Sequence, residues 1–262
     1  MRPSGGIVAR SRLRESAPEE QEWKAYYRAV YPDWWVGRAK TLAWSSYDQT
    51  LLDWLDARPG EAVLECGIGT GERYALRLAR RGVRVFGVDL AESLLKACAA
   101  NCARAGVHIA LQQGDMEALP YDDGAFDRVY CFSSLWYLPH VEHALREMFR
   151  VSRLGGAIVF DMMNAFHVTP ALAFLAAAVK RRLGRSAGRW RPHGPWEIER
   201  ILRRCGATWR LQGFGVLLPT ALPIVGDRAN LARRWRLTDV GLRDSPLRYL
   251  GARLVYACRR ST

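Results

Sequence analysis

Short apolar runs alternate with longer helical patterns through the middle of the chain. The runs at 62–66 and 83–88 are apolar at almost every position, which is typical of parallel strands buried on both faces. Similar runs follow at 107–111, 127–132 and 157–161, and helical patterns separate them. This order predicts an α/β fold built on a mostly parallel sheet.

The two ends of the chain depart from this alternation. We expect helices at 19–32 and at about 37–56 before the first strand, and an apolar helix at 169–185 after the fifth. Two more strands, at about 208–218 and 252–259, are expected near the C-terminus.

Three glycines interrupt the chain directly after the first strand, at Gly67, Gly69 and Gly71. Glycine lets a ligand approach the main chain closely and permits the positive φ of a strand-to-helix turn. The second strand leads into Asp89, whose carboxylate can accept hydrogen bonds from both hydroxyls of a ribose. A dinucleotide site would have glycine where this chain has Glu72, an anion at the place of the diphosphate. The pattern therefore favours a nucleoside without a phosphate.

Glu65 and the three glycines resemble motif I, E/D-x-G-x-G-x-G, of the class I S-adenosylmethionine-dependent methyltransferases. The resemblance continues with GDMEALPYDDGAFDRVY at 114–130 and ALREMFRVSRLGG at 144–156. The chain is most similar to the small-molecule type, such as the ubiquinone and menaquinone biosynthesis methyltransferases. This resemblance implies S-adenosyl-L-methionine as cofactor. It also implies a Rossmann-like, seven-stranded, mostly parallel sheet with helices on both faces, closed by an antiparallel pair of strands.

The resemblance also implies how the chain is divided. A disordered tail at 1–17 precedes an N-terminal helical lid at 18–58 and the cofactor-binding core at 59–165. An inserted helical cap after strand five and the last core helix occupy 166–206, and the closing strands with an acceptor-side loop occupy 207–262. In this family the lid covers the cofactor and shapes the acceptor pocket.

Positions that match the family's motifs are expected to hold the cofactor. Asp115 stands where the family's acid accepts a hydrogen bond from the adenine amino group, and Met116 stands where a side chain lies against the ring. The complete set implied by the resemblance comprises Glu65, Gly67, Gly69, Gly71, Asp89, Leu90, Asp115, Met116, Cys131 and Phe132.

Aromatic and polar side chains around the strand ends are the candidates for the acceptor pocket. Many members of the family have a histidine after strand four, where this chain has Trp136 and Tyr137, so Tyr137 becomes a candidate for orienting the acceptor or handling a proton. His167 is the best placed of the five histidines for a general base. The substrate-binding candidates are Tyr27, Tyr31, Trp35, Trp136 and Asn164.

The net charge of +13 is concentrated in the last third of the chain. Residues 166–262 contain 19 basic and 5 acidic side chains, whereas residues 1–165 are close to neutral. Such a basic region suits an acidic carrier protein, an anionic membrane surface or RNA phosphates. The six cysteines form no C-x-x-C pair, so we expect no metal and a reducing cytoplasmic location.

Three functions compete at this point. The first is methylation of an O or N atom, or of a C atom, in an apolar or aromatic small molecule of secondary-metabolite or cofactor biosynthesis, by in-line transfer in which positioning dominates. The second is RNA methylation, which the basic region favours, although no N/D-P-P-Y/F motif follows strand four. The third is methylation of an acceptor carried by a protein or a membrane. A binding module without activity is least favoured, and the apolar helix at 169–185 could also serve a homodimer.

Overall fold

The computed structural model describes residues 18–29, 46–138, 140–183, 190–216 and 241–260. One seven-stranded sheet forms its centre, with the strand order β3-β2-β1-β4-β5-β7-β6. β7 runs antiparallel to both of its neighbours, and the other pairs are parallel. The predicted α/β fold is therefore confirmed. The strands are β1 Ala62–Cys66, β2 Arg84–Asp89, β3 Ala110–Gln113, β4 Phe126–Cys131, β5 Ser152–Met163, β6 Ala207–Phe214 and β7 Arg253–Arg260.

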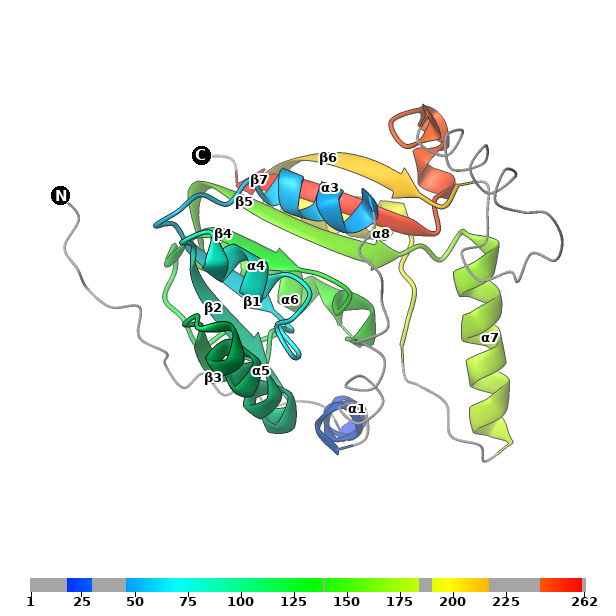
Figure 1. Cartoon of the computed structure of the whole chain (residues 1–262). Helices are drawn as coiled ribbons and strands as arrows, with labels where there is room; N and C mark the ends of the chain where they lie inside the picture. The colour runs from blue at the N-terminus through cyan, green and yellow to red at the C-terminus, as the bar shows by residue number, and fades with distance from the viewer. Residues whose placement is uncertain (1–17, 30–45, 139, 184–189, 217–240, 261–262) are drawn as a thin grey trace, which may run out of the picture.

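Helices cover both faces of the sheet (Figure 1). One face carries α3, α4 and α5, and the other carries α6 and α8. α1 and α7 lie beyond the end toward which the parallel strands run, together with the short helix η1. The helices are α1 Pro18–Ala29, α3 Ser46–Leu55, α4 Ala75–Arg80, α5 Glu92–Ala105, α6 Val141–Val151, α7 Val168–Arg182 and α8 Pro195–Arg204, with the 3-10 helices η1 Leu135–Tyr137 and η2 Pro246–Leu250.

The covering helices pack through one apolar side each. In α6, Val141, Leu145 and Met148 recur at helical spacing and are buried, whereas Arg146 on the opposite side is exposed. Burial of such a stripe, at about 25 cal/mol per Å² of apolar surface, is what attaches these helices to the sheet. α5 ends where the sequence predicts, because Gly106 takes the left-handed conformation that closes a helix.

The boundaries of three strands differ by more than one residue from the sequence prediction, and one of these strands, β6, ends at Phe214 and not near 218. The fifth strand is longer than expected, because Gly155 and Gly156 lie in an irregularity within β5 and do not precede it. There Phe126 pairs with Ser152, but Arg128 already pairs with Ala157. The third strand begins later, at Ala110, because Val107 still donates to Cys102 at the end of α5.

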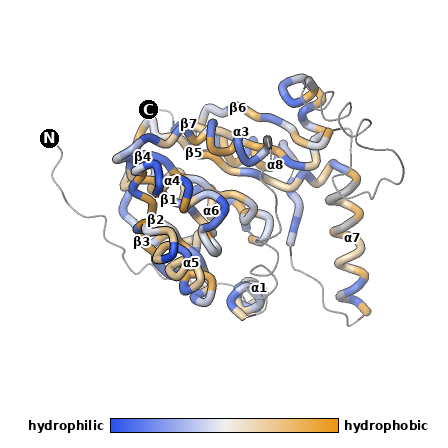
Figure 2. The backbone as a smooth tube through the Cα atoms, viewed as in Figure 1, coloured by the Kyte–Doolittle hydropathy of each residue, from blue (hydrophilic) through white to orange (hydrophobic). Residues whose placement is uncertain are grey.

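The lid and the cap are described only in part. The predicted tail at 1–17 and the first part of the second N-terminal helix lie outside the described residues, so the division of the chain into domains stays a prediction. α7 follows β5 and presents large apolar side chains to solvent, among them Leu172, Leu175 and Val179. Figure 2 shows hydrophobic positions along much of this helix. No helix among the described residues is long and apolar enough to cross a bilayer.

Candidate functional site

The glycine turn after β1 has the conformation that its composition predicts. Gly67, Gly69 and Gly71 all have positive φ, between 56° and 73°. A Cβ added at Gly67 would lie 2.6 Å from Ser134 Oγ and 3.1 Å from Met116 Cε. The turn therefore tolerates no side chain at Gly67, and the N–H groups of Gly67 and Ile68 both donate to the Val88 carbonyl.

Asp89 lies beside this turn, at the end of β2. Its carboxylate accepts hydrogen bonds from the backbone N–H of Gly69 (2.9 Å) and of Ala91 (3.0 Å). Burial raises the pKa of Asp89, and these backbone bonds oppose the rise. Each carboxylate oxygen has two lone pairs, so the group held in this way can still accept two ribose hydroxyls.

Glu65, on β1, is buried beneath the turn. Desolvation raises its pKa to about 8, although the Tyr130 hydroxyl, which donates to Glu65 Oε2 at 2.7 Å, lowers it. A carboxyl that is readily protonated at neutral pH can donate a hydrogen bond as well as accept one.

Asp115 has a partner that the sequence did not predict. Lys24, on the lid helix α1, forms ion pairs with Asp115 Oδ2 and, at 3.1 Å, with Glu117 Oε2. The other oxygen of Asp115 accepts the N–H of Glu117 at 2.9 Å. These ion pairs fix α1, the helix of the predicted lid, to the loop in which the adenine is expected.

The other cofactor candidates lie around the same turn. Met116 approaches the Cβ position of Gly67, and the carbonyl of Leu90 accepts a bond from Gln113. Cys131 and Phe132, at the end of β4, are both buried, and the ring of Phe132 meets Tyr74 edge-on at 4.9 Å. The glycines, the acid Asp89 and these apolar side chains lie around one turn, here called the cradle, and their binding of a nucleoside stays a prediction.

A buried ion pair attaches α3 to the glycine turn. Arg73 binds Asp48 through Nε (2.7 Å) and Nη2 (2.8 Å), and the Tyr74 hydroxyl donates to the same carboxylate at 2.6 Å. Asp48 is completely buried. The sequence analysis did not single out these three residues.

Aromatic side chains from distant parts of the chain meet beside the cradle. The rings of Tyr27, on α1, and Tyr137, on η1, lie 5.3 Å apart, and the Trp23 indole donates to the Tyr137 carbonyl. Trp136 is buried next to Tyr137. The structure thus brings three of the acceptor candidates together, whereas Tyr31 and Trp35 lie outside the described residues.

The side chains of Asn164 and His167 both form hydrogen bonds within the protein. The Asn164 amide donates to the carbonyls of Tyr249 and Gly251, both at 2.8 Å, and its oxygen accepts the N–H of Phe166. This amide holds η2 against the end of β5 and has little capacity left for an acceptor. His167 is buried, which lowers its pKa, while a backbone hydrogen bond with Gly215 raises it. Its role as a base stays a prediction.

A polar group at the same edge is formed by Tyr47, Ser133, Asp161 and Arg253; the sequence places Asp161 at this strand end but does not indicate its three partners. The buried Asp161 carboxylate accepts bonds from the Tyr47 hydroxyl, the Ser133 N–H (2.6 Å) and Arg253 Nη1 (3.0 Å). Ser133 has a φ of 61°, which is unusual outside glycine. The sequence held one signal for Arg253. A last strand that runs antiparallel to the others begins at the edge where the parallel strands end, so its first residue lies at that edge.

The described part of the chain contains no cluster of three or more His, Cys, Asp or Glu side chains that could hold a metal ion.

Residues 64–160 match a family model described as a methyltransferase domain. Malonyl-[acyl-carrier protein] O-methyltransferase of Serratia marcescens is 40% identical over 143 residues, which are 50% of this chain and 53% of that protein. Ubiquinone biosynthesis O-methyltransferase of Pseudomonas fluorescens strain Pf0-1 is 26% identical over 198 residues, 73% of this chain and 82% of that protein. The chain thus spans about half of the first relative and most of the second.

A solved structure has the same fold. Phosphoethanolamine N-methyltransferase 2 of Haemonchus contortus, in complex with S-adenosyl-L-methionine, superposes with a TM-score of 0.59 at 15% identity over 82% of this chain and 52% of that chain. At this identity the likeness concerns the fold alone.

Proposed function

This chain belongs to the class I S-adenosylmethionine-dependent methyltransferases, and on that premise we propose that it transfers the cofactor's methyl group to an apolar or aromatic small molecule. The methyl group goes to an O or N atom of the acceptor. The names of the relatives, which are O-methyltransferases, support oxygen as the first choice.

One juxtaposition carries this proposal. The nucleoside cradle of Gly67, Gly69 and Asp89 lies at the same sheet edge as the aromatic residues Tyr27, Trp136 and Tyr137. Ser134 connects the two, since its hydroxyl lies 3.4 Å from the Gly67 carbonyl. A cofactor held by the glycines would therefore face an apolar, aromatic space, which suits an acceptor of the same character.

The residues of the chain have distinct tasks in this proposal. Asp89 holds the ribose, and the absence of side chains at the three glycines allows the methionine part to approach the turn. When bound, the sulfonium of the cofactor supplies an electrophilic methyl group. Tyr27, Trp136 and Tyr137 hold the acceptor and exclude water, which is the main requirement for an in-line transfer. Tyr137 and His167 are the candidates for receiving a proton where the acceptor needs to lose one.

The test uses methyl-labelled S-adenosylmethionine, the purified protein and a lysate of the host cells. After incubation the mixture is separated into organic-soluble, RNA and protein fractions, and we expect the label in the organic fraction. Asp89→Ala removes two charge-assisted hydrogen bonds to the ribose, so transfer should fall about 100-fold at subsaturating cofactor. Asp53→Ala, an exposed carboxylate on α3, is the matched control and should transfer like the unaltered chain.

An equal loss of methyl transfer in Asp89→Ala and Asp53→Ala would contradict the proposal. Label found only in the RNA fraction would contradict it as well. Label in RNA would instead assign the basic last third of the chain to phosphate contacts.

A carrier-bound acceptor is the second candidate, and α7 favours it. The exposed apolar positions of this helix lie next to exposed basic side chains such as Lys180 and Arg182. Such a surface complements an acidic carrier protein, and one relative is named for a substrate of this kind. In the same experiment, this candidate predicts label that precipitates with a small acidic protein.

A further inference from the structure

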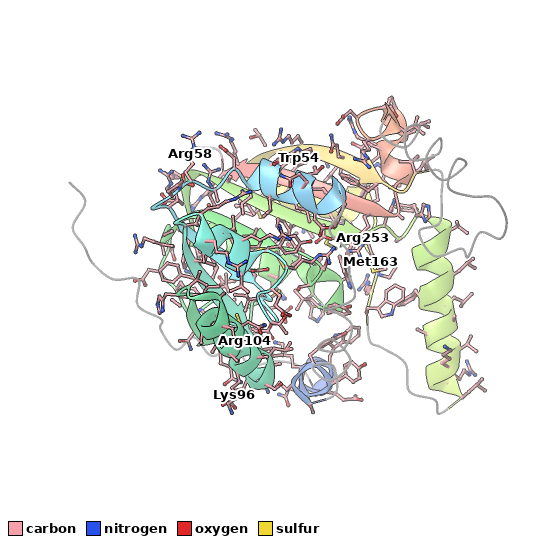
Figure 3. The ribbon with its side chains drawn as sticks, in the orientation of Figure 1. Trp54, Arg58, Lys96, Arg104, Met163 and Arg253 are labelled. Carbon is pink, nitrogen blue, oxygen red and sulfur yellow. The ribbon has the colours of Figure 1, made fainter. Side chains whose placement is uncertain are left out.

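Arg253 lies at the acceptor side of the sheet because β7 runs backwards. In the β5·β7 pair Arg253 is opposite Met163, at the carboxyl end of β5. Figure 3 shows Arg253 and Met163 together at this edge. A side chain from the last strand of the chain thereby reaches the place where acceptors are held in the proposed function.

Among the described residues the guanidinium forms hydrogen bonds through Nη1 alone, and its carbon also lies 5.8 Å from the centroid of the Tyr47 ring. Nη1 donates to Asp161 Oδ2 at 3.0 Å and lies 3.5 Å from Ser133 Oγ, and the group stacks over the Trp136 ring with its carbon 4.3 Å from the ring centroid. Hydrogen bonds of Arg253 to other described residues involve neither Nε nor Nη2. The side chain is 34% exposed, so these N–H groups remain accessible to a ligand.

The charge of this group is permanent. Burial tends to lower the pKa of Arg253, but Tyr47, Asp161 and Tyr137 raise it above its ordinary value. Guanidinium N–H groups form a planar fork that matches a carboxylate in a bidentate manner. Because Asp161 shares the same guanidinium, it repels a bound monoanion less than a phosphate dianion, so a monoanion suits this position better.

We propose that Arg253 binds a carboxylate of the acceptor, so that the substrates of this enzyme are apolar or aromatic carboxylic acids. The proposal rests on the proposed function and narrows its substrate class. Trp136 and Tyr137 provide the apolar surface, and Arg253 sets the orientation of the molecule on it. The methionine part of the cofactor also has a carboxylate, so the experiment separates these two sources.

The first arm measures binding by calorimetry. S-adenosylhomocysteine is first titrated into each of three proteins: the unaltered protein, Arg253→Lys and Arg253→Met. Each resulting complex is then titrated with 3-phenylpropanoate or, separately, with its methyl ester. We expect the same S-adenosylhomocysteine affinity in all three proteins. The unaltered protein should bind the carboxylate at least about tenfold more tightly than the ester, and both variants should lose that preference, because lysine lacks the fork. Arg259 is an exposed arginine at the opposite end of β7, so Arg259→Met is the control and should keep the preference for the carboxylate over the ester.

Several outcomes would overturn the proposal. A tenfold or larger loss of S-adenosylhomocysteine affinity in Arg253→Lys would assign the residue to the cofactor. Equal binding of acid and ester by the unaltered protein would exclude carboxylate recognition. Arg253→Lys retains a charge beside Asp161, and its melting curve shows whether the fold is intact.

The second arm uses labelled S-adenosylmethionine and lysate. The labelled organic products should extract into solvent better from acid than from neutral buffer, or should release methanol on mild alkaline hydrolysis, since they carry a carboxyl group or its methyl ester. Products with neither property contradict the proposal. If the unaltered protein transfers no label, the proposed function fails, and the calorimetric arm still decides the role of Arg253.

Discussion

The two halves of the site are built in different ways. The centre of the cofactor half is local in sequence, since the turn from Gly67 to Gly71 and the acid Asp89 belong to one strand, turn, helix and strand unit. The acceptor half is assembled from α1, α3, η1, β5 and β7, and the bond between Tyr47 and Asp161 joins positions 114 residues apart. Local backbone geometry dictates the first half, whereas tertiary packing dictates the second.

This difference predicts that substitutions in the glycine turn act on ligand binding, and that substitutions of side chains that join distant elements act first on stability or order. The following predictions test it, from the largest expected effect to the smallest.

Gly67→Ala should nearly abolish cofactor binding. A Cβ there meets Ser134 at 2.6 Å, so the turn must shift, and a shift of about 1 Å at a binding site can cost about 100-fold. Gly60→Ala is the matched control, because Gly60 also has positive φ but a Cβ there meets nothing within 4 Å. Both variants should lose about 1 kcal/mol of stability to backbone strain. Isothermal titration with S-adenosylmethionine should separate them, and similar affinities would contradict the steric argument.

Asp48→Ala should lower the free energy of unfolding by about 3 kcal/mol, because it leaves Arg73 and Tyr74 without their buried carboxylate. Urea denaturation measures this loss. Asp53→Ala, on the exposed side of the same helix, should cost less than about 0.5 kcal/mol. Equal losses would show that the ion pair does not attach α3 to the turn.

Glu65 should make stability fall as the pH rises between about 5 and 8. Burial raises its folded pKa to about 8 from an ordinary 4.5, so in this window the folded state keeps a proton that the unfolded state releases. The slope should reach at most about 1.4 kcal/mol per pH unit and should flatten in Glu65→Gln. Tyr130→Phe removes a hydrogen bond that lowers this pKa, so its slope should extend to higher pH. Urea midpoints across the pH range provide the measurement, and an unchanged slope in Glu65→Gln would refute the assignment.

Lys24→Gln should loosen α1 by about 1 kcal/mol, since the ion pairs with Asp115 and Glu117 are largely shielded from water. Hydrogen exchange of α1 should become several-fold faster, at the rate expected for about 1 kcal/mol. Lys96→Gln breaks an exposed pair with Glu92 on α5 and serves as the control. If both variants left exchange of α1 unaltered, Lys24 would not fix the lid.

The sequence was sufficient for the fold, the family and the cofactor. Apolar runs identify the buried strands, and the three glycines with Asp89 favour a nucleoside, because both signals are local; the resemblance to the family's motifs implies which cofactor it is. The prediction of an S-adenosylmethionine-dependent methyltransferase is confirmed. The domain boundaries and the roles of individual site residues stay predictions.

The sequence could not indicate which acceptor-side residues meet. In the sequence, Lys24 resembles any surface cation, and only the position of α1 shows that it pairs with Asp115. Arg253 is likewise one of many arginines, and only the direction of β7 shows that it lies at the acceptor side. Asn164 follows a strand end, as a pocket residue would, but its amide is used by the backbone of Tyr249 and Gly251. Partners separated by many residues leave no periodic signal.

The direction of β7 also matters for how such an enzyme can diversify. Arg253 is encoded far from the glycine turn, yet it lies on the same edge of the sheet. Under the proposed role of Arg253, mutation within the codons of β7 exchanges one acceptor preference for another and leaves the glycine turn untouched. For an engineer, the codons of β7 are then a compact target for a library of specificity variants.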